Sequence, residues 1–502
     1  MNIKYRNFPP IALLAICTIL PSQLFASQFT VTSTGDPATG NPDACAVGSA
    51  ACTLRDALAA ADLTAEMDGI GFAVSEPIFL RKALTATQAV TIDGGGSTTI
   101  RVDQGYNIKT LLDRPVFGND NVQVLQPTYF SVGQPNRPML ELIGVGSVVS
   151  NIHLDGSITP LPADLGVARI DFDSNDTTDF LLYTIDSDGD TIEDRWLVAG
   201  GIYVTGSPTV SGNELTNFNN NAIGVEFSFN AVVTDNLISG GAAGQPAFSA
   251  DGISFFSSAV SVVSGNTVSG FRNGMAITHS SGINVNGNEL AGNINGIELD
   301  QMDTSFGQNV VIDNIVADNQ KRGILVTSVS GAQITGNEVD DNSEVGIHIK
   351  TAGEISLTGN EVKRNGSGAR EHGGILISEG SGLITVDSNE LISNQGFAVV
   401  IDGSFGNVLS NNELKSNAGV GLILLNGAMW NQVLANEVLN NFVGMISGVE
   451  NDPLFPSSNF FQGNTLQLNT AIDALDFDPV CNDAWIANTI GSSASVSDNC
   501  ID

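Results

Sequence analysis

Basic residues are scarce in this 502-residue sequence, which holds 19 Lys and Arg against 54 Asp and Glu, for a formal net charge of -35. A surface this acidic repels nucleic acids and anionic membranes, and it attracts cations. Aromatic residues make up only 6% of the chain, whereas Gly contributes 55 residues. Few aromatics, few charges and many Gly are typical of short strands joined by tight turns, so long helices are not expected.

Long apolar runs are also missing, with one exception near the N-terminus. Lys4 and Arg6 precede an apolar run at 11–20, and small residues close the segment at Ala26. This three-part layout predicts a secretory signal peptide over residues 1–26 and therefore a secreted or cell-surface mature chain. The run is shorter than the ~20 apolar residues that a membrane-spanning helix needs, so no membrane insertion is expected.

Cysteines are few, and four of the five form two local pairs. Cys45 lies near Cys52, and Cys481 lies near Cys500. In an exported protein this spacing predicts two disulfides that staple the ends of the fold. A metal site is the alternative, although no clustered His joins either pair. Cys17 lies inside the leader, where lipidation is the alternative to a cleaved signal peptide.

One short pattern recurs from residue 213 onward, in which an Asn follows a small or polar residue and an apolar residue stands two places after it, as in Gly212-Asn213-Glu214-Leu215. The spacing of successive members has a base period near 23 residues, with occasional insertions, and such regularity marks a stacked array. The recurring residues are Asn213, Asn236, Asn266, Asn288, Asn314, Asn337, Asn360, Asn389, Asn412, Asn436, Asn464 and Asn488.

Within each period, a Gly is usually followed by alternating apolar residues, as at Ile347 and Ile349. Period-two alternation predicts short strands with one buried face, so each period forms one coil of three strands and three corners. Stacked coils then make three parallel sheets. The recurrent Asn or Gly fits a left-handed corner, and stacked Asn side chains can hydrogen-bond amide to amide. A leucine-rich repeat is the alternative, but Leu interchanges here with Val and Ile.

Two segments carry a resemblance to a known family. Residues 201–470 resemble the right-handed β-helix repeats of pectate-lyase-like proteins, and CTLRDALAAAD at 52–62 resembles the CSLREA-type motif found before such helices in bacterial exported proteins. Thr53 and Asp56 stand where that motif has Ser and Glu. The resemblance implies an all-β fold, a right-handed parallel β-helix solenoid of the pectin-lyase-like type.

Both ends of such a solenoid need caps, because terminal coils expose apolar side chains and unpaired strand edges. Thr53 can cap a short helix whose apolar face, Leu54, Ala57, Leu58 and Ala61, would cover the first coil. The expected organisation is a signal peptide (1–26), a CSLREA-like N-terminal cap (27–68), irregular first coils (69–160), an acidic insertion (161–200), regular repeats (201–470) and a C-terminal cap (471–502).

The acidic insertion carries two loops with oxygen ligands at the same four offsets. Alternate carboxylate and amide oxygens in a tight loop suit a hard cation, so we expect calcium. These are not EF-hands, because Gly at the sixth place and Glu at the twelfth are missing; they resemble the short calcium loops of thrombospondin type 3 and integrin propeller repeats. A solvated pair of acidic turns is the alternative. The candidate ligands are Asp171, Asp173, Asn175 and Asp179, then Asp186, Asp188, Asp190 and Asp194.

A candidate catalytic face follows from the strand alternation. If Ile347 and Ile349 point inward, His348 and Lys350 point outward, and the same rule places Glu298 and Asp300 outward. Arg322 lies in the one stretch of the chain that is rich in basic residues. These residues could hold an anionic sugar while Lys350 or His348 removed a proton. Ordinary solvated surface is the alternative.

The sequence therefore favours a non-catalytic extracellular protein that presents a surface to glycans or to a cell-surface protein. No arrangement typical of pectate lyases, polygalacturonases or alginate epimerases is present. A polysaccharide lyase or epimerase acting on an anionic polymer is the alternative function, with Asp300, Arg322, His348 and Lys350 as its candidate site.

Overall fold

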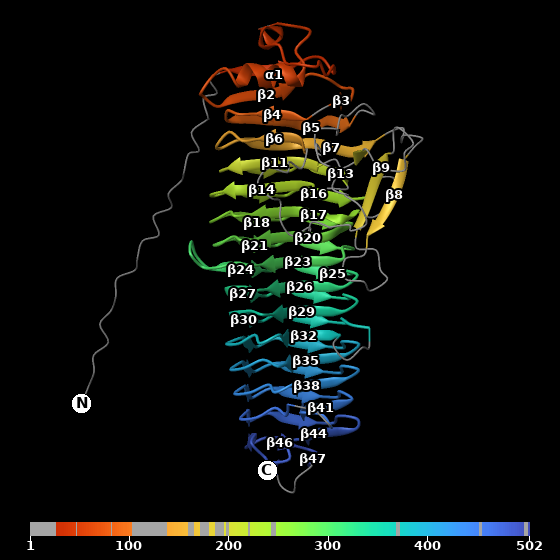
Figure 1. Ribbon diagram of the computed structural model, residues 1–502, viewed down its shortest axis with the longest axis vertical. Helices are drawn as coiled ribbons and strands as arrows, with labels where there is room; N and C mark the ends of the chain where they lie inside the picture. The colour runs from red at the N-terminus through yellow and green to blue at the C-terminus, as the bar shows by residue number, and fades with distance from the viewer. Residues whose placement is uncertain are drawn as a thin grey trace, which may run out of the picture.

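The computed structural model describes residues 27–46, 48–81, 83–102, 138–158, 165–170, 180–185, 195–196, 200–218, 221–241, 247–367, 372–450, 454–495 and 500–501. These residues form an elongated solenoid in which each coil lies directly above the next (Figure 1). The predicted parallel β-helix is confirmed. The signal peptide prediction falls on residues outside the described ranges.

Most coils contribute one strand to one sheet and two strands to another, and all pairings within these two sheets are parallel. The first, here sheet B, contains β4 (Leu84–Ala86), β6 (Pro138–Leu142), β11 (Gly200–Gly206), β14 (Ile223–Ser228), β17 (Ala247–Phe256), β20 (Phe271–Thr278), β23 (Asn295–Asp300), β26 (Arg322–Thr327), β29 (Val345–Lys350), β32 (Gly373–Ser378), β35 (Phe397–Asp402), β38 (Val420–Leu425), β41 (Val443–Ser447), β44 (Ile472–Asp476) and β47 (Ser493–Ser495).

The second, sheet A, holds two parallel runs of strands. They are β1 (Gln28–Val31), β2 (Asp68–Phe72), β3 (Ile78–Leu80), β5 (Val90–Val102), β7 (Val148–Ile158), β12 (Thr209–Ser211), β13 (Glu214–Phe218), β15 (Val232–Thr234), β16 (Leu237–Gly240), β18 (Val262–Ser264), β19 (Thr267–Ser269), β21 (Asn284–Asn286), β22 (Glu289–Ala291), β24 (Asn309–Ile312), β25 (Ile315–Ala317), β27 (Ser330–Thr335), β28 (Glu338–Asp340), β30 (Gly353–Thr358), β31 (Glu361–Lys363), β33 (Thr385–Asp387), β34 (Glu390–Ile392), β36 (Val408–Ser410), β37 (Glu413–Lys415), β39 (Gln432–Leu434), β40 (Glu437–Leu439), β42 (Phe460–Gln462), β43 (Thr465–Gln467), β45 (Ala484–Ile486) and β46 (Thr489–Ile490).

The interior is filled by stacked apolar side chains. Ile324, Ile347 and Ile375 pair in register in successive coils of sheet B and are at most 1% exposed. Such columns extend along the solenoid because each strand turns alternate residues inward. The predicted period-two pattern is confirmed.

A ladder of asparagines joins the coils inside one corner. Asn337 Nδ2 donates to Asn360 Oδ1 at 2.9 Å, and Asn314 Nδ2 donates to Asn337 Oδ1 at the same distance. The left-handed residue is the one before each Asn, such as Gly336 with φ 66° and Asp313 with φ 54°. The predicted left-handed corner is therefore confirmed for Gly, as at Gly336, and is wrong for the ladder Asn, which follows the left-handed residue and turns its side chain inward to bond its neighbour.

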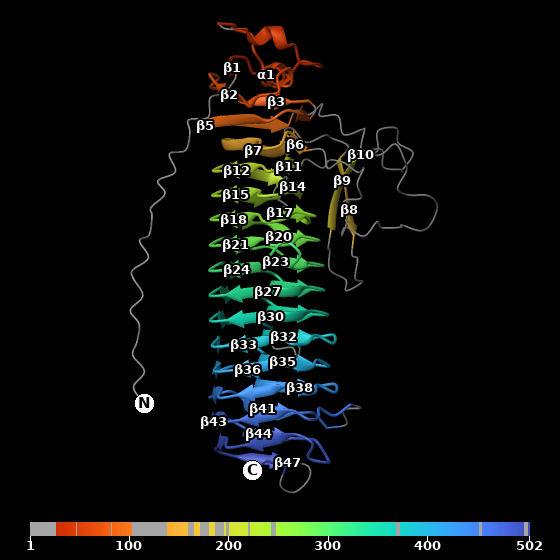
Figure 2. The ribbon, with the colours of Figure 1, turned by 90° about the vertical axis from the view of Figure 1, so that its left-hand side faces the viewer.

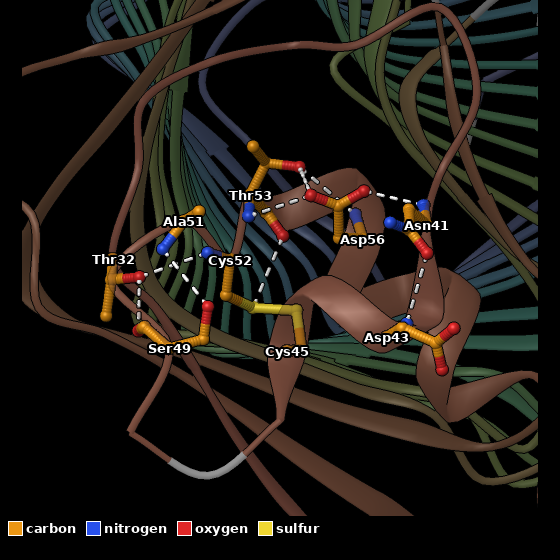
Figure 3. The surroundings of a disulfide bond; sticks show 9 residues. All are labelled: Thr32, Asn41, Asp43, Cys45, Ser49, Ala51, Cys52, Thr53 and Asp56. Carbon is orange, nitrogen blue, oxygen red and sulfur yellow. Dashed lines mark hydrogen bonds between the residues drawn. A yellow bond between two sulfur atoms is a disulfide. The ribbon is translucent and has the colours of Figure 1, made fainter.

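The N-terminal end is closed by the helix α1 (Leu54–Ala61), which lies across the first coil (Figure 1). Thr53 and Asp56 form the capping box, in which the Thr53 hydroxyl accepts from the Asp56 amide and Asp56 accepts from the Thr53 amide. Cys45, the last residue of the short helix η1 (Pro42–Cys45), is bonded to Cys52 (Figure 3). The predicted cap and its disulfide are confirmed.

The C-terminal end is closed by the second predicted disulfide, Cys481–Cys500. Trp485 extends the interior stack, because its ring lies on Phe461 with centroids 4.0 Å apart. Two disulfides fit an oxidising compartment outside the cytosol. Among the described residues, no helix has the length and apolar character to cross a bilayer.

The acidic insertion forms a small antiparallel sheet of β8 (Leu165–Ile170), β9 (Phe180–Ile185) and β10 (Arg195–Trp196). It lies beside the N-terminal half of the solenoid (Figures 1 and 2), and β9 contacts β17 of sheet B. The acidic insertion is therefore adjacent to sheet B at β17.

Candidate functional site

The outward surface of sheet B changes character along the solenoid. In the coils from β11 to β29 it carries most of the polar and ionisable side chains of this face, and we call this part the acid face. From β32 onward the corresponding column is apolar, with Leu376, Val400 and Ile423 paired in register. The acid face includes Tyr203, Glu226, Asp251, Arg272, Asn273, Asn295, Glu298 and Asp300.

Two carboxylates of the acid face share one amide. Asn273 Nδ2 donates to Asp251 Oδ1 at 2.9 Å and to Glu298 Oε2 at 2.6 Å, and Asn295 Nδ2 donates to Asn273 Oδ1 at 3.0 Å. The register explains the arrangement, since Asp251, Asn273 and Asn295 follow one another in β17, β20 and β23. Asn273 thus holds an acid from the coil above and an acid from the coil below.

Both carboxyl groups of this pair bind protons more tightly than free acids do. Burial raises the pKa of Asp251 to about 6, although the nearby Arg272 opposes this rise. Burial also raises the pKa of Glu298, with Arg272 again opposing the rise and Asp300 adding to it. Raised carboxyl pKa values in a surface site are typical of groups that donate or accept protons near neutral pH.

A second acid and several rings flank the pair. The Tyr203 hydroxyl donates to Glu226 Oε2 at 3.0 Å, and burial raises the pKa of Glu226. Phe256, on β17, contacts Phe227 edge-on with centroids 5.8 Å apart and His279 with centroids 5.3 Å apart. The acid face therefore also carries a second acid, Glu226, and an aromatic cluster around Phe256, which is in register with Glu226.

The structure brings the four sequence-predicted residues onto one part of sheet B. Asp300, Thr327 and Lys350 are paired in register, and Arg322 lies near enough to His348 to lower its pKa. Whether these residues take part in catalysis stays a prediction. Their surroundings, however, differ from the exposed arrangement expected for His348 and for the basic stretch.

His348 is covered, with only 8% of the residue exposed. Its Nε2 lies 2.9 Å from Ser378 Oγ, and Leu325 and Leu376 pair with it from the coils above and below. Burial, then the charges of Arg322 and Lys350, lower its pKa to about 3, so the imidazole is neutral at pH 7. The predicted alternation holds, because His348 lies between the inward Ile347 and Ile349, but alternation predicts only the side of a strand, and the neighbouring side chains bury His348 on that side.

Acidic partners neutralise much of the basic stretch. Lys350 Nζ lies 3.5 Å from Glu379 Oε1, and Arg322 Nη2 lies 3.7 Å from Glu344 Oε2. Arg364 pairs with both Asp340 and Asp341, and Lys363 pairs with Glu361. Arg370 is outside the described residues. Salt bridges of this kind leave little free positive charge to hold an anionic polymer.

The candidate calcium ligands all lie outside the described residues. They are Asp171, Asp173, Asn175, Asp179, Asp186, Asp188, Asp190 and Asp194. Across the ranges that the structure does describe, no cluster of three His, Cys, Asp or Glu residues is placed to hold a metal ion. Calcium binding by the two loops is therefore a proposal from the sequence, and it is open to a simple test.

We expect a chelator to lower the melting temperature of the protein, because loops rich in carboxylates repel themselves when no cation is bound. The double variant Asp173→Ala and Asp188→Ala is expected to melt at the same temperature with and without chelator. Differential scanning fluorimetry with EDTA and with added calcium measures this. Identical wild-type curves under both conditions would rule out calcium binding by these loops.

A comparison with family models identifies the architecture independently. The model described as the right-handed β-helix region matches residues 191–326 and 292–443, which together span half of the chain. The chain belongs to the right-handed β-helix family. The matched residues include most of the acid face, with Asp251, Asn273 and Glu298 among them.

Several solved structures share this β-helix architecture at low identity. The mannuronan C-5 epimerase AlgE4 A-module of Azotobacter vinelandii is 13% identical, with 80% of this chain and 92% of that chain covered and a TM-score of 0.41. The periplasmic alginate epimerase AlgG is 12% identical, with 84% and 78% covered and a TM-score of 0.42. A mutant DFA-IIIase from Arthrobacter chlorophenolicus A6, in complex with DFA-III, is 12% identical, with 81% and 94% covered and a TM-score of 0.44. No curated protein matches the sequence.

Proposed function

We propose that this β-helix binds a polysaccharide along the acid face and hydrolyses its glycosidic bonds. Asp251 acts as the general acid and Glu298 as the nucleophile. The observation that carries the proposal is the shared amide of Asn273, which fixes one oxygen of each carboxylate within a hydrogen bond of the same nitrogen atom. Cleavage of a glycosidic bond commonly requires two carboxyl groups held at a set separation.

The separation of the two carboxylates supports a retaining mechanism. Because both bonds end on Asn273 Nδ2, the two bonded oxygens lie no farther apart than the two bond lengths laid end to end. The two bonded oxygens are therefore closer together than the roughly 6.5–9.5 Å that separates the carboxyl groups of inverting enzymes, and nearer to the about 5–5.5 Å of retaining ones. The pair therefore suits a covalent glycosyl intermediate.

The different surroundings of the two acids support their different roles. Asp251, with a pKa of about 6, holds its proton in mildly acidic solution and can deliver it to the leaving oxygen. Burial raises the pKa of Glu298 too, with Arg272 and Arg322 opposing the rise, and Arg322 is the cation that acts on Glu298 and not on Asp251 among the causes of the two shifts. We assign Glu298 as the nucleophile on this difference. Asn273 donates to both acids and so keeps their oxygens oriented.

The charge of the chain favours a neutral polymer over an anionic one. The protein carries a formal charge of -35, and the basic residues Arg322 and Lys350 of the acid face are already paired with Glu344 and Glu379. Like charges repel over a Debye length of about 8–10 Å in physiological salt. The negative charge of the protein would therefore repel a uronate polymer, whereas it would not repel a neutral glycan.

The test is incubation of the purified protein with a panel of polysaccharides. Hydroxyethyl cellulose, xylan, galactomannan and mixed-linkage glucan represent neutral polymers, and alginate and pectate represent anionic ones. We expect new reducing ends from at least one neutral polymer and no unsaturated ends from any. Unsaturated ends from alginate or pectate would instead support the lyase alternative, and their loss in Lys350→Ala would establish it.

We expect kcat/KM to fall as the pH rises above about 6. Burial raises the pKa of Asp251 from its ordinary value of 3.8 to about 6. Below pH 6 the carboxyl group is mostly protonated, and above it the group loses the proton that the leaving group needs. The variant Asp251→Asn should lack this limb of the profile. It should also lose much less rate on aryl glycosides, whose leaving groups need no proton. A profile that is flat between pH 5 and pH 8 in the wild type would contradict this role.

A further inference from the structure

Three large apolar side chains protrude from one turn of the solenoid in consecutive coils. Leu383, Phe405 and Trp430 are 60%, 45% and 62% exposed, and we call them the apolar ridge. They lie in the turn that leads from sheet B to sheet A, after β32, β35 and β38. This turn is part of the ladder, because Gly382, Phe405 and Met429 form parallel bridges from coil to coil.

The ridge is continuous along the solenoid axis. The Phe405 ring lies over Gly382, where an added Cβ atom would meet it at 2.9 Å, and the Leu383 side chain lies 3.6 Å from the corresponding point on Gly406. The backbone amide of Trp430 continues the turn by donating to the Ser457 carbonyl in the next coil. The three residues therefore come from consecutive coils, which are spaced at about 4.8 Å, with Phe405 one turn position before that of Leu383 and Trp430.

The solenoid does not need these side chains in order to fold. Leu383 and Trp430 adopt left-handed backbone conformations, with φ of 59° and 57°, whereas Gly406 holds the same turn position in the coil between them. Asn230 holds it in an earlier coil with φ 59°. A bulky apolar residue in this conformation is strained, and its exposure brings no burial in return. Because neither Leu383 nor Trp430 packs in the core, we attribute their bulky apolar side chains to the binding of a partner molecule.

Polar groups border the ridge on the side of sheet B. Asp402 ends β35, and Asn426, which follows β38, donates from its side chain to Asp402 Oδ1. Glu379 directly follows β32, one coil earlier, and accepts from Thr351 and Lys350. An occupant of the ridge must therefore offer an apolar surface to the rings and hydroxyl groups to carboxylates and amides. It must also carry no negative charge.

We infer that the apolar ridge is a remote binding subsite for a neutral polysaccharide chain. A sugar ring presents an apolar C–H face, which aromatic faces attract, and a rim of hydroxyl groups, which Asp402 and Asn426 can bond. This inference rests on the proposed function for the identity of the ligand. It adds that the polymer runs along the solenoid axis, because the ridge lies on the turn bordering the same sheet as Asp251 and Glu298.

The distance between ridge and acid face makes the subsite selective for long chains. Glu298 lies on β23, and Trp430 follows β38, five sheet B strands further along. Leu383, at the near end of the ridge, follows β32, three strands along. At about 4.8 Å per strand the axial span is therefore about 14 Å to Leu383 and about 24 Å to Trp430, so a trisaccharide bound at the acid pair does not cover the ridge. Only a longer chain gains the second contact, and that contact strengthens its binding without altering the chemistry.

The test compares the double variant Leu383→Asn and Trp430→Asn with Leu468→Asn. Leu468 is a matched control, because it is 74% exposed with φ 62° but lies outside the ridge. Affinity electrophoresis in gels containing each neutral polymer measures binding, and hydrolysis of polymer and trisaccharide measures KM and kcat. We expect the double variant to bind polymer about tenfold more weakly or worse, with unchanged kcat and unchanged KM for trisaccharide. Its melting temperature should equal or exceed that of the wild type.

Several results would overturn the ridge as a subsite. These are unchanged polymer binding in the double variant, an equal loss in Leu468→Asn, an equal loss on trisaccharide, or no binding of any neutral polymer by the wild type. A dimer in sedimentation that the double variant dissociates would assign the ridge to a second copy of the chain instead. Ridge-dependent binding without hydrolysis would support the subsite and contradict the catalytic role of the acid pair.

Discussion

Replacement of Glu298 by Gln is expected to reduce hydrolysis of the preferred polymer by about 10²–10⁴-fold while leaving its binding nearly unchanged. Gln keeps the shape of the side chain and an oxygen that can accept from Asn273 Nδ2, so the local hydrogen bonds persist. What it removes is the charged oxygen that attacks the sugar. Initial rates of reducing-end release, together with binding in affinity gels, separate the two effects.

The control for this prediction is Glu390→Gln, which makes the same chemical change on the exposed surface of sheet A. It should hydrolyse the polymer at the wild-type rate. A Glu298→Gln protein of wild-type activity would remove the catalytic role of the acid pair, and a loss shared equally with Glu390→Gln would show that the effect is a general one.

Replacement of Asn337 by Ala is expected to destabilise the solenoid by roughly 3–5 kcal/mol. Asn337 is fully buried, and its Oδ1 accepts from the backbone and side-chain nitrogens of Asn314 at 3.0 and 2.9 Å. Its Nδ2 donates to Asn360 Oδ1 and to the Val311 carbonyl. Ala would leave several buried polar groups without partners, each at a cost of about 1–3 kcal/mol.

The matched control is the neighbouring Glu338→Ala, because that side chain is exposed at the start of β28. Guanidinium unfolding followed by circular dichroism should show a change within about 0.5 kcal/mol for this variant. Equal stability of the two variants would mean that the asparagine ladder does not contribute to the stability of the solenoid.

The fold could be predicted from the sequence because its two periodicities are both local. The interval near 23 residues fixes which asparagines stack, and the alternation around Ile347 fixes which side chains fill the interior. The sequence also contained a second ladder that was missed, in which an Asn five places after the first stacks in the same way. Asn342 Nδ2, for example, donates to Asn365 Oδ1 at 2.9 Å. The fixed interval of five is the signal that could have revealed it.

The acid pair was harder to predict because it depends on register between coils of unequal length. Alternation placed Glu298 on the outward side, but its partner Asp251 lies in a coil with an insertion, where the period shifts. Only the pairing of β17, β20 and β23 shows that Asn273 lies between the two acids. The burial of His348 could not be predicted for the same reason, because Leu325 and Leu376, which lie beside it, belong to neighbouring coils.

The most direct measurement of the central claim is the configuration of the first sugar released from the preferred neutral polymer, followed by proton NMR before mutarotation. Two carboxylate oxygens that accept from one amide nitrogen lie closer together than the acid and base of an inverting enzyme, so we predict that the anomeric configuration is retained. Release of the inverted anomer, or of a product with a carbon–carbon double bond, would contradict it.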